Sequence, residues 1–338
     1  MNAPVKGTVM SDTFFTAAPH WAWWIILYFF VGGIAGAAFF LASMLQLFSR
    51  QSSVVGRQMV THSELGTSTT IRPIARVGYY IAFIGVLLSG FLLTIDLTRP
   101  LRFWHMLIEN HTGQPMFKLW EPMSTGAWAL LLFGLFAFLA ALAALSEDRP
   151  NIRLLQAAPV RLLRQRGPSA IIAVLGSIFG LYIAGYTGVL LAVTNRPIWA
   201  DSQLLGLLFL LSAASTGPAA LILLGQRRLA ADHASLSWLI WFDWVVVILE
   251  LVVLVVFLIS LGSVARVFLD WWGLVLLVGV FGVGILLPLF LHPKHGAEDL
   301  ASCVRIAGFV LVGGFLLRMV MLLSSEQIHV IGSGVTGR

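Results

Sequence analysis

The chain has 338 residues, of which 59% are hydrophobic and 11% are charged, and its formal net charge is +6. A soluble domain carries roughly 25% charged residues, so this composition excludes a water-exposed surface and favours a protein embedded in lipid. The basic residues are spread through several segments and form no dense stripe, which argues against nucleic-acid binding. The single cysteine, Cys303, excludes a disulfide framework and an iron–sulfur cluster held by this chain alone.

Eight long apolar runs follow one another along the sequence. Each suits a helix that crosses a bilayer, which takes ~20 residues, and backbone groups in lipid must be paired within their own segment. The first run is too long for the apolar core of a cleavable signal peptide, so we expect it to stay in the membrane. The sequence therefore predicts an all-α integral membrane protein with about eight transmembrane helices. The predicted spans are residues 22–48, 76–97, 125–146, 169–193, 203–225, 238–261, 271–291 and 302–324.

Basic residues are distributed unevenly between the two sides of this predicted protein. The loops after the first, third, fifth and seventh spans carry twelve Lys and Arg residues, whereas the other side carries seven. Because positive charge favours the cytoplasmic side, we place these four loops in the cytoplasm and both termini outside. The inner loop 147–167 is strongly basic and is expected to lie in water or at the membrane interface.

The outer loop 98–123 has an unusual composition for a linker. It mixes Trp104, His105, Phe117 and Trp120 with charged residues. Tryptophan gathers at membrane interfaces, so anchoring in the interface explains these aromatics. A docking surface for a partner protein explains them equally well, and the sequence leaves both interpretations open.

Ionisable side chains within the predicted spans are functional candidates, because a charge in lipid is costly. Asp243 and Glu250 are seven residues apart in the sixth span and so share one helix face. Together with Arg318 of the eighth span they could form a proton path from the cytoplasm. The alternative is a buried charge pair that stabilises helix packing. No histidine falls in the middle of an apolar run, and a haem inside the bundle would need such a ligand, so no haem is predicted.

Polar and aromatic side chains collect near the predicted outer ends of the first, second and fourth spans. A quinone ring needs a titratable donor, a phenol or amide partner and an apolar slot. Each residue alone is explained as an interfacial anchor, but their convergence on one side favours a quinone site. The candidates are His20, Tyr28, Asp96, Arg99, Tyr182, Tyr186, Thr187, Asn195 and Trp199.

Three segments resemble the NrfD/PsrC-type family, the membrane subunits of polysulfide reductase-like complexes. They are HWAWWIILYFFVGGIAGAAFF from His20, DLTRPLRFWHML from Asp96 and GYTGVLLAVTNRPIW from Gly185. The resemblance implies two four-helix bundles in the inner (cytoplasmic) membrane of a bacterial or archaeal cell. On this basis we expect bundles at residues 22–193 and 203–324, with outer tails at 1–21 and 325–338.

The resemblance also implies a function. It implies a menaquinone or ubiquinone site near the outer face, contacted by a histidine and a tyrosine that correspond to His20 and Tyr186. It further implies no haem and no iron–sulfur cluster in this chain, a ferredoxin-type iron–sulfur partner and, in many complexes, a molybdopterin catalytic subunit. We therefore predict a quinone-reactive anchor subunit in which His20, Asp96 and Tyr186 act on the quinone. Proton translocation through Asp243, Glu250 and Arg318 is an additional hypothesis.

Two other functions fit parts of the sequence. Residues 28–45 are similar to residues 207–224, and such internal repeats are typical of secondary transporters. With the two carboxylates of the sixth span, this likeness supports an ion-translocating subunit without a redox role. A purely structural anchor is the third hypothesis, and it predicts no effect of substitutions among the outer polar residues.

Overall fold

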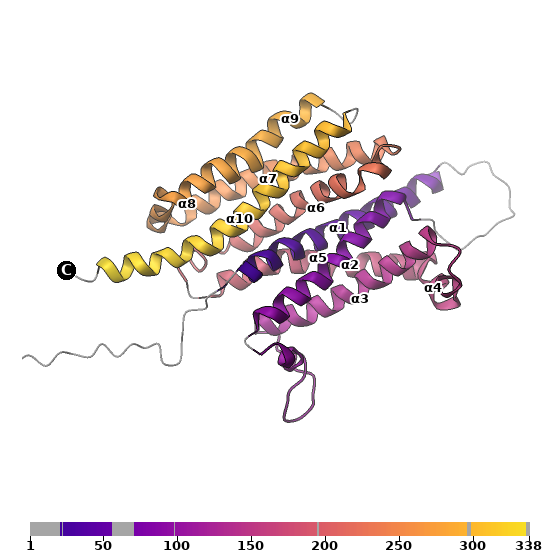
Figure 1. Ribbon diagram of the computed structural model, residues 1–338, viewed down its shortest axis with the longest axis horizontal. Coiled ribbons are helices and arrows are strands. Elements are labelled where there is room, and N and C mark those ends of the chain that lie inside the picture. The colour runs from indigo at the N-terminus through magenta and orange to yellow at the C-terminus, as the bar shows by residue number, and fades with distance from the viewer. Residues whose placement is uncertain are drawn as a thin grey trace, which may run out of the picture.

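We describe a computed structural model that covers residues 21, 23–55, 71–97, 99–194, 196–295 and 299–335, with the backbone alone for 48–55, 292–295 and 326–335. Eight helices of the described residues are long and apolar enough to cross a membrane, which confirms the predicted all-α membrane fold (Figure 1). The helices are α1 (Trp23–Val55), α2 (Pro73–Asp96), α3 (Pro122–Asp148), α5 (Arg166–Ala192), α6 (Leu205–Leu229), α7 (His233–Ser260), the continuous run α8 (Trp271–Leu274), η5 (Val275–Leu286) and α9 (Leu287–His295), and α10 (Leu300–Val335).

For description we divide the helices into two halves in chain order. The first half contains α1, α2, α3 and α5, and the second contains α6, α7, the α8–η5–α9 run and α10 (Figure 1). The halves meet where α6 packs against α1 and α5. Close packing depends on small residues: a Cβ added to Gly36 of α1 would collide with the carbonyl of Gly180 of α5, and one added to Gly188 would collide with Leu205. Glycines at such crossings let helix backbones approach closely in membranes.

Two faces of the protein lie at opposite ends of the helices. The hairpin face carries the α2–α3 connection, residues 97–121, together with residues 193–204 and 261–270. The basic face carries residues 149–165, which form the short helices η3 (Arg153–Gln156) and α4 (Ala158–Leu163). The α2–α3 connection contains a 3₁₀ helix, η2 (Pro100–Met106), and η4 (Gly262–Leu269) lies in the α7–α8 connection.

Several helices extend past the apolar runs that predicted them, because charged side chains in the end turns pair with one another. Helix α3 continues through Glu147 and Asp148 on the basic face. Arg76 of α2 pairs with Glu147 at 2.8 Å and with Asp148 at 2.7 Å, and Arg228 of α6 pairs with Asp148 at 2.9 Å. These ion pairs join α2, α3 and α6 at the basic face. The paired residues lie at or beyond the ends of the apolar runs, so hydropathy does not predict these last helical turns.

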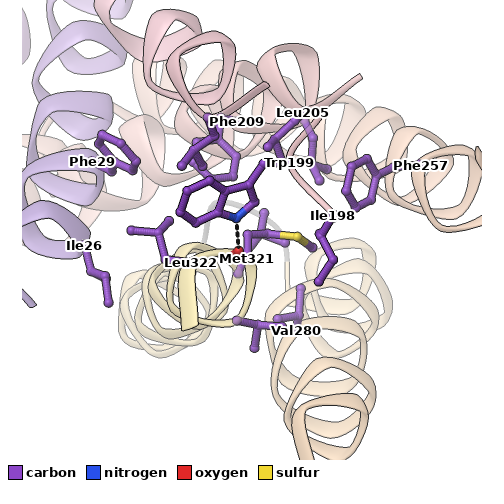
Figure 2. Close-up of a cluster of buried hydrophobic side chains, with 14 of the residues drawn as sticks. Ile26, Phe29, Ile198, Trp199, Leu205, Phe209, Phe257, Val280, Met321 and Leu322 are labelled. Atoms are coloured by element: carbon purple, nitrogen blue, oxygen red, sulfur yellow. Dashed lines mark hydrogen bonds between the residues drawn. The ribbon is translucent and has the colours of Figure 1, made fainter. Parts of the chain in front are cut away.

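A buried tryptophan joins the halves near the hairpin face. The Trp199 indole N–H donates a hydrogen bond of 2.6 Å to the carbonyl of Met321, and Phe29, Phe209 and Phe257 belong to the same hydrophobic cluster (Figure 2). Trp21 stacks on Trp199 with ring centroids 5.2 Å apart. A buried indole usually needs such a partner for its N–H, so this contact holds the α5–α6 connection against α10.

Candidate functional site

A cavity of about 950 Å³ lies inside the first half, at the end near the hairpin face. Its wall consists mainly of aliphatic side chains of α2 and α3, and it includes Thr94, whose hydroxyl donates to the Gly90 carbonyl. Three further polar side chains reach the cavity. These are Tyr28 of α1, Asp96 of α2 and Tyr186 of α5. All three were predicted as site residues, and the structure brings them to one space although they are far apart in the sequence.

The hydroxyl groups of Tyr28 and Tyr186 are available within this cavity. Both side chains are buried, with 3% and 7% of their surfaces exposed. Within the described part of the protein, neither hydroxyl has a hydrogen-bond partner. Neither hydroxyl is among the fully enclosed polar atoms that lack a partner, so both keep accessible surface. Two phenols at one cavity can donate to a polar ligand group.

The position of Tyr186 depends on a glycine that the sequence analysis did not single out. A Cβ added to Gly126 of α3 would overlap the ring and the hydroxyl of Tyr186. On its other side, Tyr186 stacks on Tyr182 with ring centroids 5.6 Å apart, and Tyr182 donates a hydrogen bond of 3.0 Å to Thr125. Gly126 and Tyr182 therefore act as positioning residues that hold the Tyr186 ring between them.

Asp96 is the last residue of α2 and lies where the cavity meets the hairpin face. It has no ion pair or hydrogen bond to another described side chain. A carboxylate at a cavity mouth can take a proton from a buried group and exchange it with water. The proton-exchange role of Asp96 stays a prediction.

The α2–α3 connection folds back over the cavity. Phe103, Met106 and Leu107, in and just after η2, line the cavity, so this loop forms part of its wall. Met116 holds the loop in place, because its carbonyl accepts hydrogen bonds from Ser124 at 3.1 Å and from Trp128 at 2.9 Å. The sequence predicts anchoring or docking for this loop but gives no sign of its role as a cavity wall.

The structure corrects several of the predicted ligand contacts. Thr187, Trp199, Arg99 and Tyr182 do not line the cavity. Thr187 donates its hydroxyl to the Ala184 carbonyl at 3.2 Å, as helical threonines often do, and Trp199 is committed to Met321. Arg99 is exposed on the hairpin face, and Tyr182 supports Tyr186 from outside.

Two further predicted residues, His20 and Asn195, lie outside the described residues. Trp21, which follows His20 in the sequence, lines the cavity. Among the described residues, no three His, Cys, Asp or Glu side chains gather as they would around a metal ion. The described site is therefore a largely apolar space with two phenols and one carboxylate.

A second polar cluster lies inside the second half. The fully buried Arg318 of α10 donates hydrogen bonds to the Ser212 hydroxyl at 3.1 Å and to the carbonyls of Gly314 at 2.7 Å and Phe29 at 3.2 Å. Its guanidinium group also lies against the Phe30 and Phe209 rings, 5.7 and 5.5 Å from their centroids. A charge buried this deeply needs such compensation.

The predicted intramembrane carboxylates belong to this cluster. Glu250 of α7 lies near Ser212, the serine whose hydroxyl accepts from Arg318. Asp243, seven residues earlier on α7, accepts a hydrogen bond of 2.9 Å from Ser215 of α6. Both carboxylates are buried. This series of polar groups ends at the Phe29 carbonyl, and Phe29 and the adjacent Tyr28 both line the cavity.

Comparison with known proteins identifies the family. A family model described as "Polysulphide reductase, NrfD" matches residues 12–330, which is nearly the whole sequence. The chain belongs to the polysulphide reductase NrfD family. The resemblance seen in three short segments is thus confirmed over the full membrane region.

Two relatives have matching length. The protein is 26% identical to Protein NrfD of Escherichia coli (strain K12) over 330 residues, covering 90% of its own sequence and 95% of that relative. It is 24% identical to the C subunit of the polysulfide reductase of Wolinella succinogenes over 342 residues, covering 92% of its own sequence and 95% of that relative. As an NrfD family member, the protein is a multi-pass integral membrane protein.

Proposed function

We propose that this protein is the quinone-reactive membrane subunit of a multi-subunit oxidoreductase, and that the cavity of the first half receives the quinone ring. The observation that carries the proposal is the pair of tyrosines, Tyr28 and Tyr186, whose hydroxyl groups have no partner among the described residues and which line one apolar space together with Asp96. Family membership supports the same function, because one relative is named as a part of polysulfide reductase.

The residues present fit a quinone. Its two ring carbonyls accept hydrogen bonds, which phenol hydroxyls donate, and the aliphatic wall suits its isoprenoid tail. When bound, a menaquinone or ubiquinone supplies a two-electron, two-proton couple. Tyr28 and Tyr186 would orient the ring, and Asp96 would exchange protons between the cavity and water at the hairpin face. His20 is proposed as a second proton-exchanging group, next to the cavity-lining Trp21.

Electrons must reach this site from another protein. The sequence has one cysteine, too few to hold an iron–sulfur cluster. We propose a ferredoxin-type iron–sulfur subunit as the direct partner, in some complexes joined by a molybdopterin catalytic subunit. The Wolinella succinogenes relative is named with a letter, C, which supports an assembly of several subunits. The hairpin face is proposed as the extracytoplasmic side of the inner membrane, with both termini there, because the opposite face is richer in arginine.

The cluster of the second half is proposed as a proton path. Asp243 bonds Ser215, Arg318 bonds Ser212 and the Phe29 carbonyl beside the cavity, and Glu250 lies near Ser212 and Arg318. Hydroxyl groups between carboxylates can pass protons by exchanging donor and acceptor roles. This path would link quinone chemistry to the basic face.

An ion-translocating subunit without a redox role is the second candidate, and the same buried polar series favours it. Under that hypothesis Glu250→Gln would abolish ion flux, and loss of the Tyr186 hydroxyl would have no effect. Under the quinone hypothesis, loss of the Tyr186 hydroxyl has the larger effect and Glu250→Gln the smaller one. Purification separates the two as well, because a quinone-reactive subunit retains an iron–sulfur partner and bound quinone.

The test of the proposed function is Tyr186→Phe in the assembled complex. The substitution removes one hydroxyl without a described partner, so subunit assembly stays intact and quinone-linked turnover falls by about a hundredfold, the lower range for a positioned proton donor. Tyr80→Phe is the matched control, because the Tyr80 hydroxyl bonds Asp148 at the basic face, 2.9 Å away. Normal turnover in Tyr186→Phe would contradict the proposed site.

A further inference from the structure

The cavity of the first half opens sideways as well as toward the hairpin face. Leu87 of α2 and Leu131 and Leu135 of α3 line the cavity, yet 57%, 51% and 50% of their surfaces are exposed. A residue that both lines a cavity and faces the outside stands at an opening. These three leucines lie within membrane-spanning segments, so the opening between α2 and α3 faces the hydrocarbon layer.

The opening has a defined edge on the side of the basic face. Toward the basic face, the rings of Phe83 and Phe138 pack against each other with centroids 5.5 Å apart and close the gap between α2 and α3. One turn nearer the hairpin face, Gly134 of α3 lies opposite Val86, with 3.8 Å between an added Cβ and the nearest valine methyl. Nearer the hairpin face, Gly90 of α2 also lines the cavity, and a Cβ added to it would meet no atom within 4 Å.

Gly90 and Gly134 differ from the packing glycines of this fold. A Cβ added to Gly36 would collide with the Gly180 carbonyl of the opposing helix, and one added to Gly180 would crowd the Phe133 ring and the Gly36 backbone, so close packing favours glycine at both positions. A Cβ added to Gly90 would meet no atom within 4 Å, and one added to Gly134 would make only ordinary contact. Glycine lowers helix stability relative to alanine, so at these two cavity-lining positions it serves another purpose than packing.

We infer that the gap between α2 and α3 is the lateral entrance for the isoprenoid tail of a quinone, and that Gly90 and Gly134 keep this entrance wide. The inference rests on the proposed function, because it assigns the tail path of the same ligand. The lining at the gap is hydrocarbon only, from Leu87, Leu131 and Leu135. A branched polyprenyl tail matches this surface and stays in contact with the lipid from which the quinone arrives.

The experiment compares ligands with and without a tail. The full-length protein and its Gly90→Phe variant are purified in lipid nanodiscs and titrated with a menaquinone of four isoprene units and with tailless menadione. Quenching of tryptophan fluorescence gives each Kd, since Trp21 lines the cavity. A second pair, a short-tailed ubiquinone and its tailless parent ring, is measured in the same way.

The expected result is a change in the ratio of affinities. In Gly90→Phe the Kd of the tailed quinone rises relative to that of the tailless ring by about tenfold or more, the scale for a side chain that occupies space the ligand needs. Gly308→Phe is the matched control. Gly308 lies on α10 away from the cavity, and a Cβ added there also meets no atom within 4 Å. The ratio of the two Kd values in Gly308→Phe should therefore equal the ratio in the unaltered protein.

The outcomes separate the two proposals. An unchanged ratio in Gly90→Phe, or an equal loss of both ligands, would overturn the entrance and leave the quinone site standing. Failure of the unaltered protein to bind any of the four ligands would instead overturn the quinone site. Gly134→Phe, on the opposite helix of the gap, provides a second test and is expected to shift the ratio in the same direction.

Discussion

The two halves of this protein differ in the hydrogen-bond partners of their buried polar side chains. In the first half, the hydroxyls of Tyr28 and Tyr186 face a cavity without described partners. In the second half, Arg318 bonds Ser212 and two carbonyls and lies against two aromatic rings, with Glu250 nearby; of the Arg318 nitrogens, only Nη2 has no hydrogen-bond partner among the described residues. Hydroxyl groups that line a cavity without described partners suit a ligand that binds and leaves. Side chains that are mostly bonded to one another suit stable packing or proton transfer between fixed positions.

This contrast predicts that substitutions in the second half damage stability first, whereas those in the first half damage binding first. The largest effect is expected for Arg318→Met. Removing one partner of a buried charge cluster costs about 3–5 kcal/mol, because Glu250 loses its compensating charge. Thermal unfolding in detergent measures the change. Combining the substitution with Glu250→Gln should restore part of the lost stability.

The control for this prediction lies on the same helix. Arg305→Met of α10 removes a partly exposed arginine that donates to Ser302 at 2.7 Å, and exposed interactions of this kind contribute about 0–1 kcal/mol. Equal stability losses in Arg305→Met and Arg318→Met would contradict the account of the second half as a charge-compensated core.

Gly126→Ala should have the next largest effect, and it affects both stability and binding. The added methyl overlaps the Tyr186 ring, so we expect overpacking to cost about 1–3 kcal/mol and the displaced hydroxyl to weaken quinone binding. Unfolding and quinone titration are measured on the same preparation. Gly134→Ala, also on α3, meets only ordinary contact and should lose no stability. Wild-type quinone affinity in Gly126→Ala would show that the position of Tyr186 does not matter.

The smallest effect is expected for Trp199→Phe. It removes one hydrogen bond, to Met321 (Figure 2), and should cost about 1–2 kcal/mol, including the unpaired carbonyl that it leaves. Because Trp199 does not line the cavity, quinone affinity should stay at the wild-type value. A selective loss of quinone affinity with normal stability would restore the ligand role first predicted for this residue.

Hydrophobic length predicts the membrane fold from sequence because each span must cross the same layer of hydrocarbon. The predicted ends of the spans also place Tyr28, Asp96 and Tyr186 near the same side of the membrane. It does not separate Tyr186 from Tyr182 or Trp199. A tyrosine or tryptophan near an interface has the same sequence signature whether it faces a cavity, supports a neighbour or joins two bundles.

Other features depend on contacts between segments that are distant in the sequence. Gly126 matters through the Tyr186 ring of another helix, and Phe103 reaches the cavity only because the α2–α3 connection folds back. Ser212 of α6 accepts a hydrogen bond from Arg318 of α10. Such roles follow from tertiary packing, so a single sequence predicts the residue types but not the partners.

Photoaffinity labelling tests the central claim most directly. The purified full-length protein is illuminated with a photoreactive azidoquinone, and the labelled peptides are identified by mass spectrometry. The account predicts saturable labelling of α1, α3 and α5 peptides that carry Tyr28, Leu130 or Tyr186, suppressed by excess unmodified quinone. Labelling confined to α6 through α10, or labelling that excess quinone does not suppress, would contradict a quinone site in the first half.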